Sequence, residues 1–304
     1  MRLSSVSKWL LVLLTFSVAW IIFYKPTFGG HSIPKGKEYN RSVNFVCSGD
    51  NQEELVDGIR FVFYIICHDE KSLEIAKKWS KCMPWSHTVL VPPSVFFESA
   101  AYSTVFPTLE ANWKSADVIG VATYKSLKFL SLEKLSAYVE LAFYRPYDIV
   151  PLYTSGEYLV PQAVKGHTHE FQMIWETTLQ SIVGLSVDEI KSFDKIEVFF
   201  RNTFLISPKW FRLLIDFMSQ SMHKVQSDKA LTSLLKSDAH YAEGKLPVAQ
   251  AIFHQDYYEW FPFVFERLPS FFFHYAGAKV FGTLRQVSLF ENADPDMKTL
   301  YKGL

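Results

Sequence analysis

Three polar residues, His68, Asp69 and Glu70, follow directly on the apolar run of residues 61–67. A lysine-rich amphipathic segment, residues 71–81, comes next. This order is typical of a buried strand that turns at once into a helix, and ligands of open α/β sheets bind where strands end beside helix N-termini. We therefore expect the three polar residues to line a binding site. The alternative is that Asp69 only caps the helix by accepting hydrogen bonds from first-turn amides.

A second pair of ionisable residues, Glu266 and Arg267, lies inside the aromatic run of residues 261–273. Burial among aromatic rings raises the pKa of a carboxyl group towards the range that suits a proton acceptor. We therefore predict that Glu266 is a general base. The alternative is that Glu266 and Arg267 form an internal ion pair that ties a loop to the core.

Fixed cations are the expected means of stabilising negative charge, because the usual metal-binding patterns are missing. The Asp-x-Asp pattern occurs only at Asp294–Asp296, in a tail that we interpret as a solvated turn. The pair His169-Glu170 lacks the second histidine of a zinc motif. We predict no cofactor, with a divalent metal left open. The candidate cations are Lys125, Arg201 and Arg267.

Further polar and aromatic residues are candidates for lining the same pocket, and each has a plainer interpretation. Glu98 fits a solvated helix position, and Asn202 fits a residue that satisfies the backbone. His167 and His169 have the spacing of metal ligands on a strand, but a loop pair without a third ligand is usually structural. Trp260 is a candidate stacking platform. Three tryptophans, Trp175, Trp210 and Trp260, lie at helical spacing from other apolar residues. The alternative for them is packing in the core.

Strand and helix patterns alternate from residue 59 onwards. We expect strands over residues 59–66, 87–91, 117–124, 148–153 and 195–206. We expect helices over residues 71–81, 109–114, 132–143 and 170–183, and from Pro208 onwards. This alternation predicts an α/β domain with a mostly parallel sheet flanked by helices. The decisive question for the site is whether the strand ends at residues 67–69 and 123–125 share one cleft with Glu266.

The N-terminal residues 9–24 are apolar and uncharged, and Arg2 and Lys8 precede them. As a helix they span about 24 Å, which suits a thin bilayer. We predict an uncleaved anchor whose basic end stays cytosolic, and a cleaved signal peptide is the alternative. Asn40 begins a glycosylation sequon in the segment that follows. The expected organisation is a cytosolic tail (1–8), a transmembrane anchor (9–24), a stem (25–58), a globular domain (59–280) and a C-terminal tail (281–304).

The charge and cysteine content exclude two further classes. The 31 basic residues balance the 31 acidic ones, so bulk charge does not attract nucleic acid. The three cysteines contain no Cys-x-x-Cys pair and make no metal pattern. Cys67 ends an apolar strand and is expected to be a buried thiol. Cys47 and Cys82 either pair in an oxidising compartment or stay free.

Several stretches, taken in their order, resemble one family. They are YIICHDEKS (64–72), SVFFES (94–99), DVIGVATYKS (117–126), HTHEFQMIW (167–175), FFRNTFLISPKWF (199–211) and PFVFERLPSFFF (262–273). They look like the glycosyltransferase-like domains found in capsule and lipopolysaccharide loci, algae and large viruses. The resemblance covers roughly residues 60–275. It implies a GT-A-like (Rossmann-like) fold that binds a nucleotide-sugar donor and a glycan or glycoconjugate acceptor.

The resemblance also implies roles for the candidate residues. The nucleotide would lie over residues 68–70, with its diphosphate beside the cations and beside Thr123, Tyr124 and Lys125. Glu266 would take the proton of an acceptor hydroxyl. The residues left for the acceptor or the pocket are Glu98, Asn202 and Trp260. The implied protein is a type II membrane glycosyltransferase of the secretory pathway, with the Golgi as the expected organelle.

One departure from the family keeps other functions open. The bacterial members carry an arginine pair where Thr123-Tyr124-Lys125 stands here, so one cation remains in place of two. A catalytically inactive lumenal domain that binds glycans or a partner enzyme is therefore the second hypothesis. The third hypothesis is an unrelated secreted or anchored hydrolase. The sequence has neither a nucleophile elbow nor a zinc motif, which argues against this hypothesis.

Overall fold

The computed structural model describes residues 55–81, 83–199, 202–241 and 246–281. All of them belong to one structural unit. None of the helices in this described part combines the length and the apolar character that a membrane span requires. Several expectations fall outside the described residues, namely the anchor and stem, Asn40, Cys47, Cys82, Arg201 and the C-terminal tail from residue 282.

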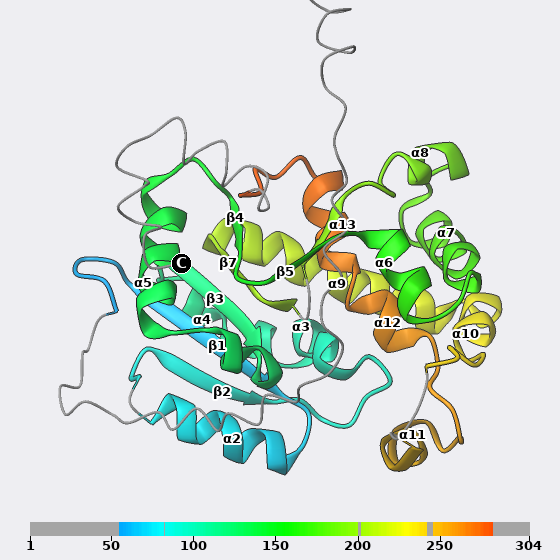
Figure 1. Ribbon diagram of the computed structural model, residues 1–304, viewed down its shortest axis with the longest axis horizontal. Helices are drawn as coiled ribbons and strands as arrows, with labels where there is room; N and C mark the ends of the chain where they lie inside the picture. Colours follow the sequence, from blue (N-terminus) through cyan, green and yellow to red (C-terminus); the bar gives the residue numbers. More distant parts are fainter. Residues whose placement is uncertain (1–54, 82, 200–201, 242–245, 282–304) are drawn as a thin grey trace, which may run out of the picture. The chain divides into compact units, whose positions relative to one another are not determined.

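A five-stranded mixed sheet forms the centre of this unit, in the order β2-β1-β3-β7-β4 (Figure 1). β1 is parallel to both β2 and β3, whereas β7 runs antiparallel to both β3 and β4. The α/β class is confirmed. The sheet is mixed, because β7 is reversed between β3 and β4, while the other four strands share one direction. The strands of this sheet are β1 (Phe61–Cys67), β2 (Ser86–Leu90), β3 (Val118–Thr123), β4 (Ile149–Pro151) and β7 (Phe204–Ile206).

The strand expected over residues 195–206 is divided in two. β6 (Glu197–Phe199) pairs with β5 (Thr154–Tyr158) in a separate two-stranded sheet, and only β7 joins the main sheet. Asn202 lies between them with a φ of 50°, a left-handed conformation that interrupts an extended chain. Apolar residues face the core on both sides of this break, so the hydrophobic pattern does not reveal it.

Helices cover both faces of the main sheet (Figure 1), as the continuous apolar run of β1 requires. Val62 and Tyr64 belong to a large core that includes α9, while Phe63 and Ile65 belong to a smaller core that includes α2 and α5. The helices are α2 (Glu70–Ser80), α3 (Ala101–Thr104), α4 (Glu110–Trp113), α5 (Leu132–Tyr144), α6 (Leu159–Gly166), α7 (Glu170–Val183), α8 (Val187–Lys191), α9 (Pro208–Ser227), α10 (Lys229–Leu235), α11 (Leu246–Phe253), α12 (Phe261–Phe265) and α13 (Leu268–Tyr275).

A glycine in β3 allows α2 to pack closely against the sheet. Gly120 is the register partner of Phe63, and a Cβ atom on Gly120 would lie 2.1 Å from Cδ2 of that ring. Only glycine therefore leaves room for the ring beside the strand. Phe63 in turn packs against Trp79 of α2, with 5.7 Å between ring centroids. This contact fixes α2 against the sheet.

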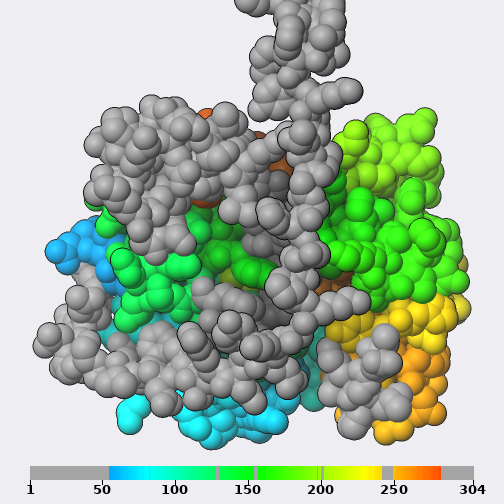
Figure 2. Space-filling model, viewed as in Figure 1, coloured from blue at the N-terminus to red at the C-terminus, as the bar shows by residue number. Residues whose placement is uncertain are grey.

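Helix α2 begins as the sequence predicts. The Asp69 Oδ1 accepts a hydrogen bond of 2.6 Å from the backbone N–H of Ser72, and the Ser72 hydroxyl accepts one from the backbone N–H of Asp69, so the capping interpretation is confirmed. Leu73 and Trp79 are buried. Ile75 is 44% exposed, because it lies about 200° round the helix from Leu73. Figure 2 shows the exposed side of α2 in cyan along the lower edge.

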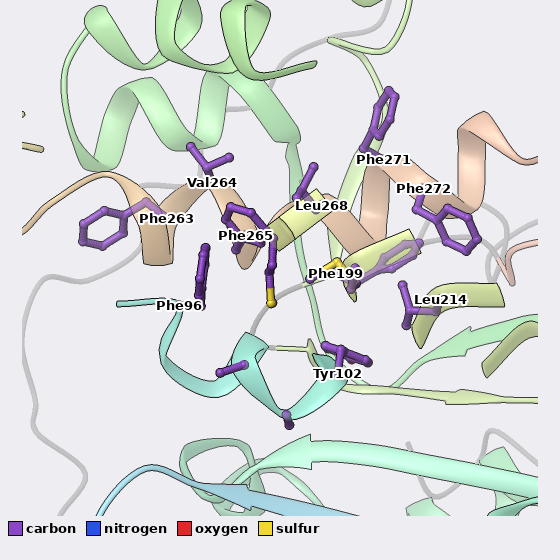
Figure 3. Packing of buried hydrophobic residues seen from close by; sticks show 14 of the residues in the cluster. Phe96, Tyr102, Phe199, Leu214, Phe263, Val264, Phe265, Leu268, Phe271 and Phe272 are labelled. Atoms are coloured by element: carbon purple, nitrogen blue, oxygen red, sulfur yellow. The ribbon is translucent and has the colours of Figure 1, made fainter. Parts of the chain in front are cut away.

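An aromatic layer joins the C-terminal helices to the segment after β2. Phe265 at the end of α12 packs against Phe96, with 4.6 Å between ring centroids (Figure 3). Phe96 directly precedes a 3-10 helix, η1 (Phe97–Ala100). The turn that holds Glu266 and Arg267 is thereby fixed close to the segment that holds Glu98. The core interpretation of the tryptophans is confirmed, since all three are buried: Trp175, Trp210 and Trp260.

Candidate functional site

A cavity of about 550 Å³ opens where β1 and β3 end. Ile66 of β1 is the register partner of Thr123 of β3, so the two strands end at the same level. Glu266 lines the same cavity. The two strand ends and Glu266 therefore do share one cleft.

Two walls with different construction enclose the cavity. We call the first the sheet-edge wall, because its residues end a strand, follow one or precede β7: His68, Asp69, Lys71, Ser72, Ile75, Phe96, Phe97, Glu98, Ser99, Thr123, Tyr124, Lys125 and Asn202. We call the second the helical wall, because most of its residues come from α6, α12 and their ends: Gln162, Gly166, His167, Tyr241, Tyr258, Pro262, Phe263, Glu266 and Arg267.

Glu98 contacts two other ionisable residues of the sheet-edge wall. Its side chain is 15% exposed, and its Oε1 lies 3.3 Å from His68 Nδ1 and 3.5 Å from Lys125 Nζ. Burial alone would raise the pKa of Glu98, but His68 and Lys125 outweigh burial and lower this pKa to about 2. Glu98 is therefore ionised at neutral pH, and its interpretation as a solvated helix position is wrong.

His68 lies between two carboxylates. Its Nδ1 faces Glu98, and its Nε2 lies 3.5 Å from Oδ2 of Asp69. The Nδ1 atom is buried and has no aligned hydrogen-bond partner among the described residues, so its contact with Glu98 is electrostatic. Hydrogen bonds from Ser72 outweigh burial and lower the pKa of Asp69, which is therefore also ionised.

Three buried hydroxyl groups fix the backbone next to Lys125. Ser126 lies 2.8 Å from Thr203 and 3.3 Å from Thr123, measured between hydroxyl oxygens. These contacts join the end of β3 to the start of β7. Lys125 itself is 44% exposed and follows β3 on a 3-10 helix, η3 (Tyr124–Phe129).

Asn202 enters the sheet-edge wall because β7 runs antiparallel to its neighbours. The start of β7, rather than its end, meets the ends of β1 and β3. Asn202 is 2% exposed, and its Nδ2 donates a hydrogen bond of 3.4 Å to the hydroxyl of Ser99. Its Oδ1 is buried without a hydrogen-bond partner in the described residues.

Arg267 is the anchored cation of the helical wall. It is 2% exposed, and its guanidinium donates hydrogen bonds of 2.6 Å to the Phe263 carbonyl and 2.7 Å to Oε1 of Gln162. Burial lowers the pKa of Arg267 while Glu266 opposes this change, and an arginine stays charged in proteins. The guanidinium also lies 5.2 Å from the ring centroid of Phe171.

Glu266 pairs with Arg267, as the alternative interpretation expects, but it is less buried than the sequence predicts. Its side chain is 28% exposed, so the expected burial in an apolar wall is wrong, and the neighbouring Phe263 and Phe265 are buried instead. Its Oε2 lies 3.9 Å from Nη1 of Arg267. An ion pair of this length with one partly exposed partner contributes little to stability. Glu266 is therefore a carboxylate that reaches the cavity.

The two histidines of the HTH stretch separate in the structure. His167 lines the cavity. Its pKa is lowered to about 4, mainly by burial and to a smaller extent by the charge of Arg267, so His167 is uncharged at neutral pH. His169 does not line the cavity. No group of three or more potential metal ligands occurs in the part of the chain that the structure describes.

Among the predicted site residues that the structure describes, two lie outside the cavity lining. Glu70 is exposed in the first turn of α2, and Trp260 is completely buried in the large core. In turn, the sequence interpretation missed Lys71, Gln162, Tyr241 and Tyr258. The sequence did contain an indication of Gln162, because this residue is polar within the otherwise apolar stretch LVPQAV. No sequence pattern distinguishes the two tyrosines from core residues.

No family model, no curated protein and no solved structure matches this chain. The function must therefore be argued from the chemistry of the cavity itself.

Proposed function

We propose that this chain is a glycosyltransferase with a GT-A-like fold, which binds a nucleotide-sugar donor in the cavity and transfers its sugar to a glycan or glycoconjugate. The observation that carries the proposal is a cavity of ligand size at the carboxyl ends of parallel strands, whose lining includes both cations and partly exposed carboxylates. A membrane anchor and a lumenal site in the secretory pathway belong to the same proposal.

The proposed reaction uses one residue of each wall. The bond between the anomeric carbon and the diphosphate oxygen breaks, and Lys125 stabilises the charge that grows on the leaving group. A bond forms between the anomeric carbon and an acceptor hydroxyl oxygen, and Glu266 accepts the hydroxyl proton. Glu98 is unsuited to that task, because a carboxylate with a pKa of about 2 is a weak base.

Calorimetric titration of the full-length chain in detergent with UDP- and GDP-sugars tests the proposal. We expect binding that survives EDTA and weakens at least about tenfold in Lys125→Gln, since one charge contact is removed. Lys191→Gln, at an exposed position of α8, is the matched control and should bind as the unaltered chain does. Equal affinity of both variants, or no binding at all, would overturn the proposal.

Strict manganese dependence would overturn the metal-free part of the proposal alone. Asp69 would then be the first carboxylate to re-examine. Asp117 is a poor candidate, because it precedes β3 and pairs with Arg60 at 2.7 Å, outside the cavity lining.

One observation favours the second candidate function, a domain that binds nucleotide-sugars or glycans without transferring sugar. Lys125 already shares its charge with Glu98, so the leaving group would compete with a carboxylate. Binding of the donor without release of nucleoside diphosphate, over a panel of glycan acceptors, would establish this function instead.

A further inference from the structure

A continuous series of aromatic rings crosses the cavity from one wall to the other. We call this series the aromatic strip, and its members are Phe97, Tyr258, Phe263, Tyr241 and His167, all of which line the cavity. Neighbouring ring centroids in the strip lie 4.1–6.2 Å apart. Phe97 belongs to the sheet-edge wall, whereas the other four residues belong to the helical wall. The strip therefore joins the two walls.

The aromatic strip is uncharged and partly open to water. Phe97, Tyr241 and His167 are half-buried, while Tyr258 and Phe263 are 8% and 9% exposed. Phenols are neutral at neutral pH, and so is His167, whose pKa is lowered to about 4. Apolar surface that water contacts gains free energy when C–H groups of a ligand cover it.

Phe97 occupies its place in the strip against the preference of its backbone. Its φ is 48°, a left-handed conformation that is unfavourable for a bulky residue. Its ring stacks on Tyr258, with 6.2 Å between centroids and 20° between ring planes. Strained residues of this kind cluster at sites where proteins hold ligands. The strain therefore points to a use for the Phe97 ring in the cavity.

The accessible charges differ between the two walls. In the sheet-edge wall, Lys125 is 44% exposed and can contact an anion. Among the described residues of the helical wall, Arg267 is the one permanent cation, and it is 2% exposed and donates to two protein oxygens. Glu266 is 28% exposed, so the charge that a ligand meets in the helical wall is negative. An anionic group therefore fits the sheet-edge wall, and an uncharged one fits the helical wall.

We infer that the aromatic strip is a subsite for the acceptor, and that this acceptor presents an uncharged sugar ring. The C–H face of the sugar packs on the rings of the strip, and a hydroxyl at its rim reaches Glu266. The inference rests on the proposed function in treating Glu266 as the group that receives a hydroxyl proton. Nucleobases also stack on aromatic rings, so the test includes nucleosides.

Saturation-transfer NMR on the full-length chain tests the inference, in an amine-oxide detergent that carries no sugar. The probes are the methyl glycosides of glucose, galactose and mannose, with uridine and guanosine as competitors. We expect at least one glycoside to bind and to stay bound when a nucleoside is added. The corresponding methyl uronide, which has a carboxylate in place of the primary alcohol, should bind at least about tenfold more weakly because Glu266 repels it.

Three results with the unaltered chain would overturn the inference. They are the absence of binding by every glycoside, equal affinity for the glycoside and its uronide, and displacement of the glycoside by a nucleoside.

Substitutions at Tyr241 separate stacking from simple apolar contact. Tyr241→Leu keeps an apolar side chain but removes the flat ring, and we expect about tenfold weaker binding of the glycoside. Tyr241→Phe keeps the ring and should keep the affinity. Tyr144→Leu is the matched control, because Tyr144 is 68% exposed on α5 and does not line the cavity.

A glycine at position 97 separates the ring of Phe97 from its backbone. Phe97→Gly removes the ring, and glycine adopts the left-handed conformation without strain. We again expect about tenfold weaker binding of the glycoside. His254→Gly is the matched control, since His254 has a φ of 57°, is exposed and does not line the cavity. Unchanged binding in a folded Phe97→Gly or Tyr241→Leu would show that these rings only pack the core, and would overturn the inference.

The outcomes separate this inference from the proposed function. Binding of a nucleotide-sugar without binding of any glycoside would overturn the inference and leave the proposed function standing. Binding of a glycoside that depends on Phe97 and Tyr241, without binding of any nucleotide-sugar, would overturn the proposed function and leave the aromatic strip as a sugar site. If either variant does not fold, the other variant and the comparison of glycoside with uronide decide.

Discussion

The two walls of the cavity hold their charged residues in different ways. In the sheet-edge wall, His68, Glu98 and Lys125 meet through charge contacts of 3.3–3.5 Å. In the helical wall, Arg267 is buried and makes two hydrogen bonds of 2.6–2.7 Å. Charge contacts rearrange when a ligand or proton arrives, whereas a buried, hydrogen-bonded guanidinium does not. The comparison assigns ligand response to the sheet-edge wall and rigidity to the helical wall.

The largest expected effect on stability comes from Arg267. Arg267→Met leaves the Phe263 carbonyl and the Gln162 side chain without their donor. At about 1–3 kcal/mol for each acceptor left unsatisfied, we expect a loss of about 2–5 kcal/mol in the free energy of unfolding, measured by urea denaturation. Arg212→Met is the matched control, because Arg212 is 43% exposed in its pair with Glu110 and should cost about 1 kcal/mol or less. Equal costs would show that the helical wall is not the rigid one.

An intermediate, pH-dependent effect is expected at Glu98. Its pKa falls from 4.5 to about 2 on folding, which corresponds to at most about 3 kcal/mol of stabilisation. Because the folded pKa is the lower one, this contribution is complete above about pH 4.5 and disappears as the pH falls towards about 2. The difference in unfolding free energy between the unaltered chain and Glu98→Gln should shrink over that window. A difference that stays constant would remove Glu98 from the charge network.

The smallest effect on stability is expected at Glu266. Its contact with Arg267 is 3.9 Å long, and its side chain is 28% exposed, so Glu266→Gln should change the free energy of unfolding by less than about 1 kcal/mol. Turnover in a transfer assay should nevertheless fall by about 10²–10⁴-fold, because the proton acceptor is lost. Unchanged turnover, or a loss that only follows a loss of stability, would leave Glu266 without a catalytic role.

Local features of the site were predictable from the sequence, and non-local ones were not. The end of β1, the cap at Asp69 and the end of β3 follow from patterns of a few neighbouring residues. The contact of Glu98 with His68 and Lys125, and the bond from Arg267 to Gln162, join segments far apart in the chain. A pattern of apolar residues gives neither the direction of a strand nor its neighbours, which is why the antiparallel β7 was missed.

The reversed strand β7 also has a consequence for the order in which the chain can fold during synthesis. β2, β1 and β3 are complete once residue 123 has been made, and they are direct neighbours. β4 is made next, yet its partner in the sheet is β7, so residues 149–151 stay unpaired until residue 206 leaves the ribosome. The backbone N–H of Phe281 then bonds to the Ile149 carbonyl at 2.8 Å. A nascent chain therefore carries an open sheet edge while residues 124–206 are made, and release or truncation within this interval is a route to aggregation.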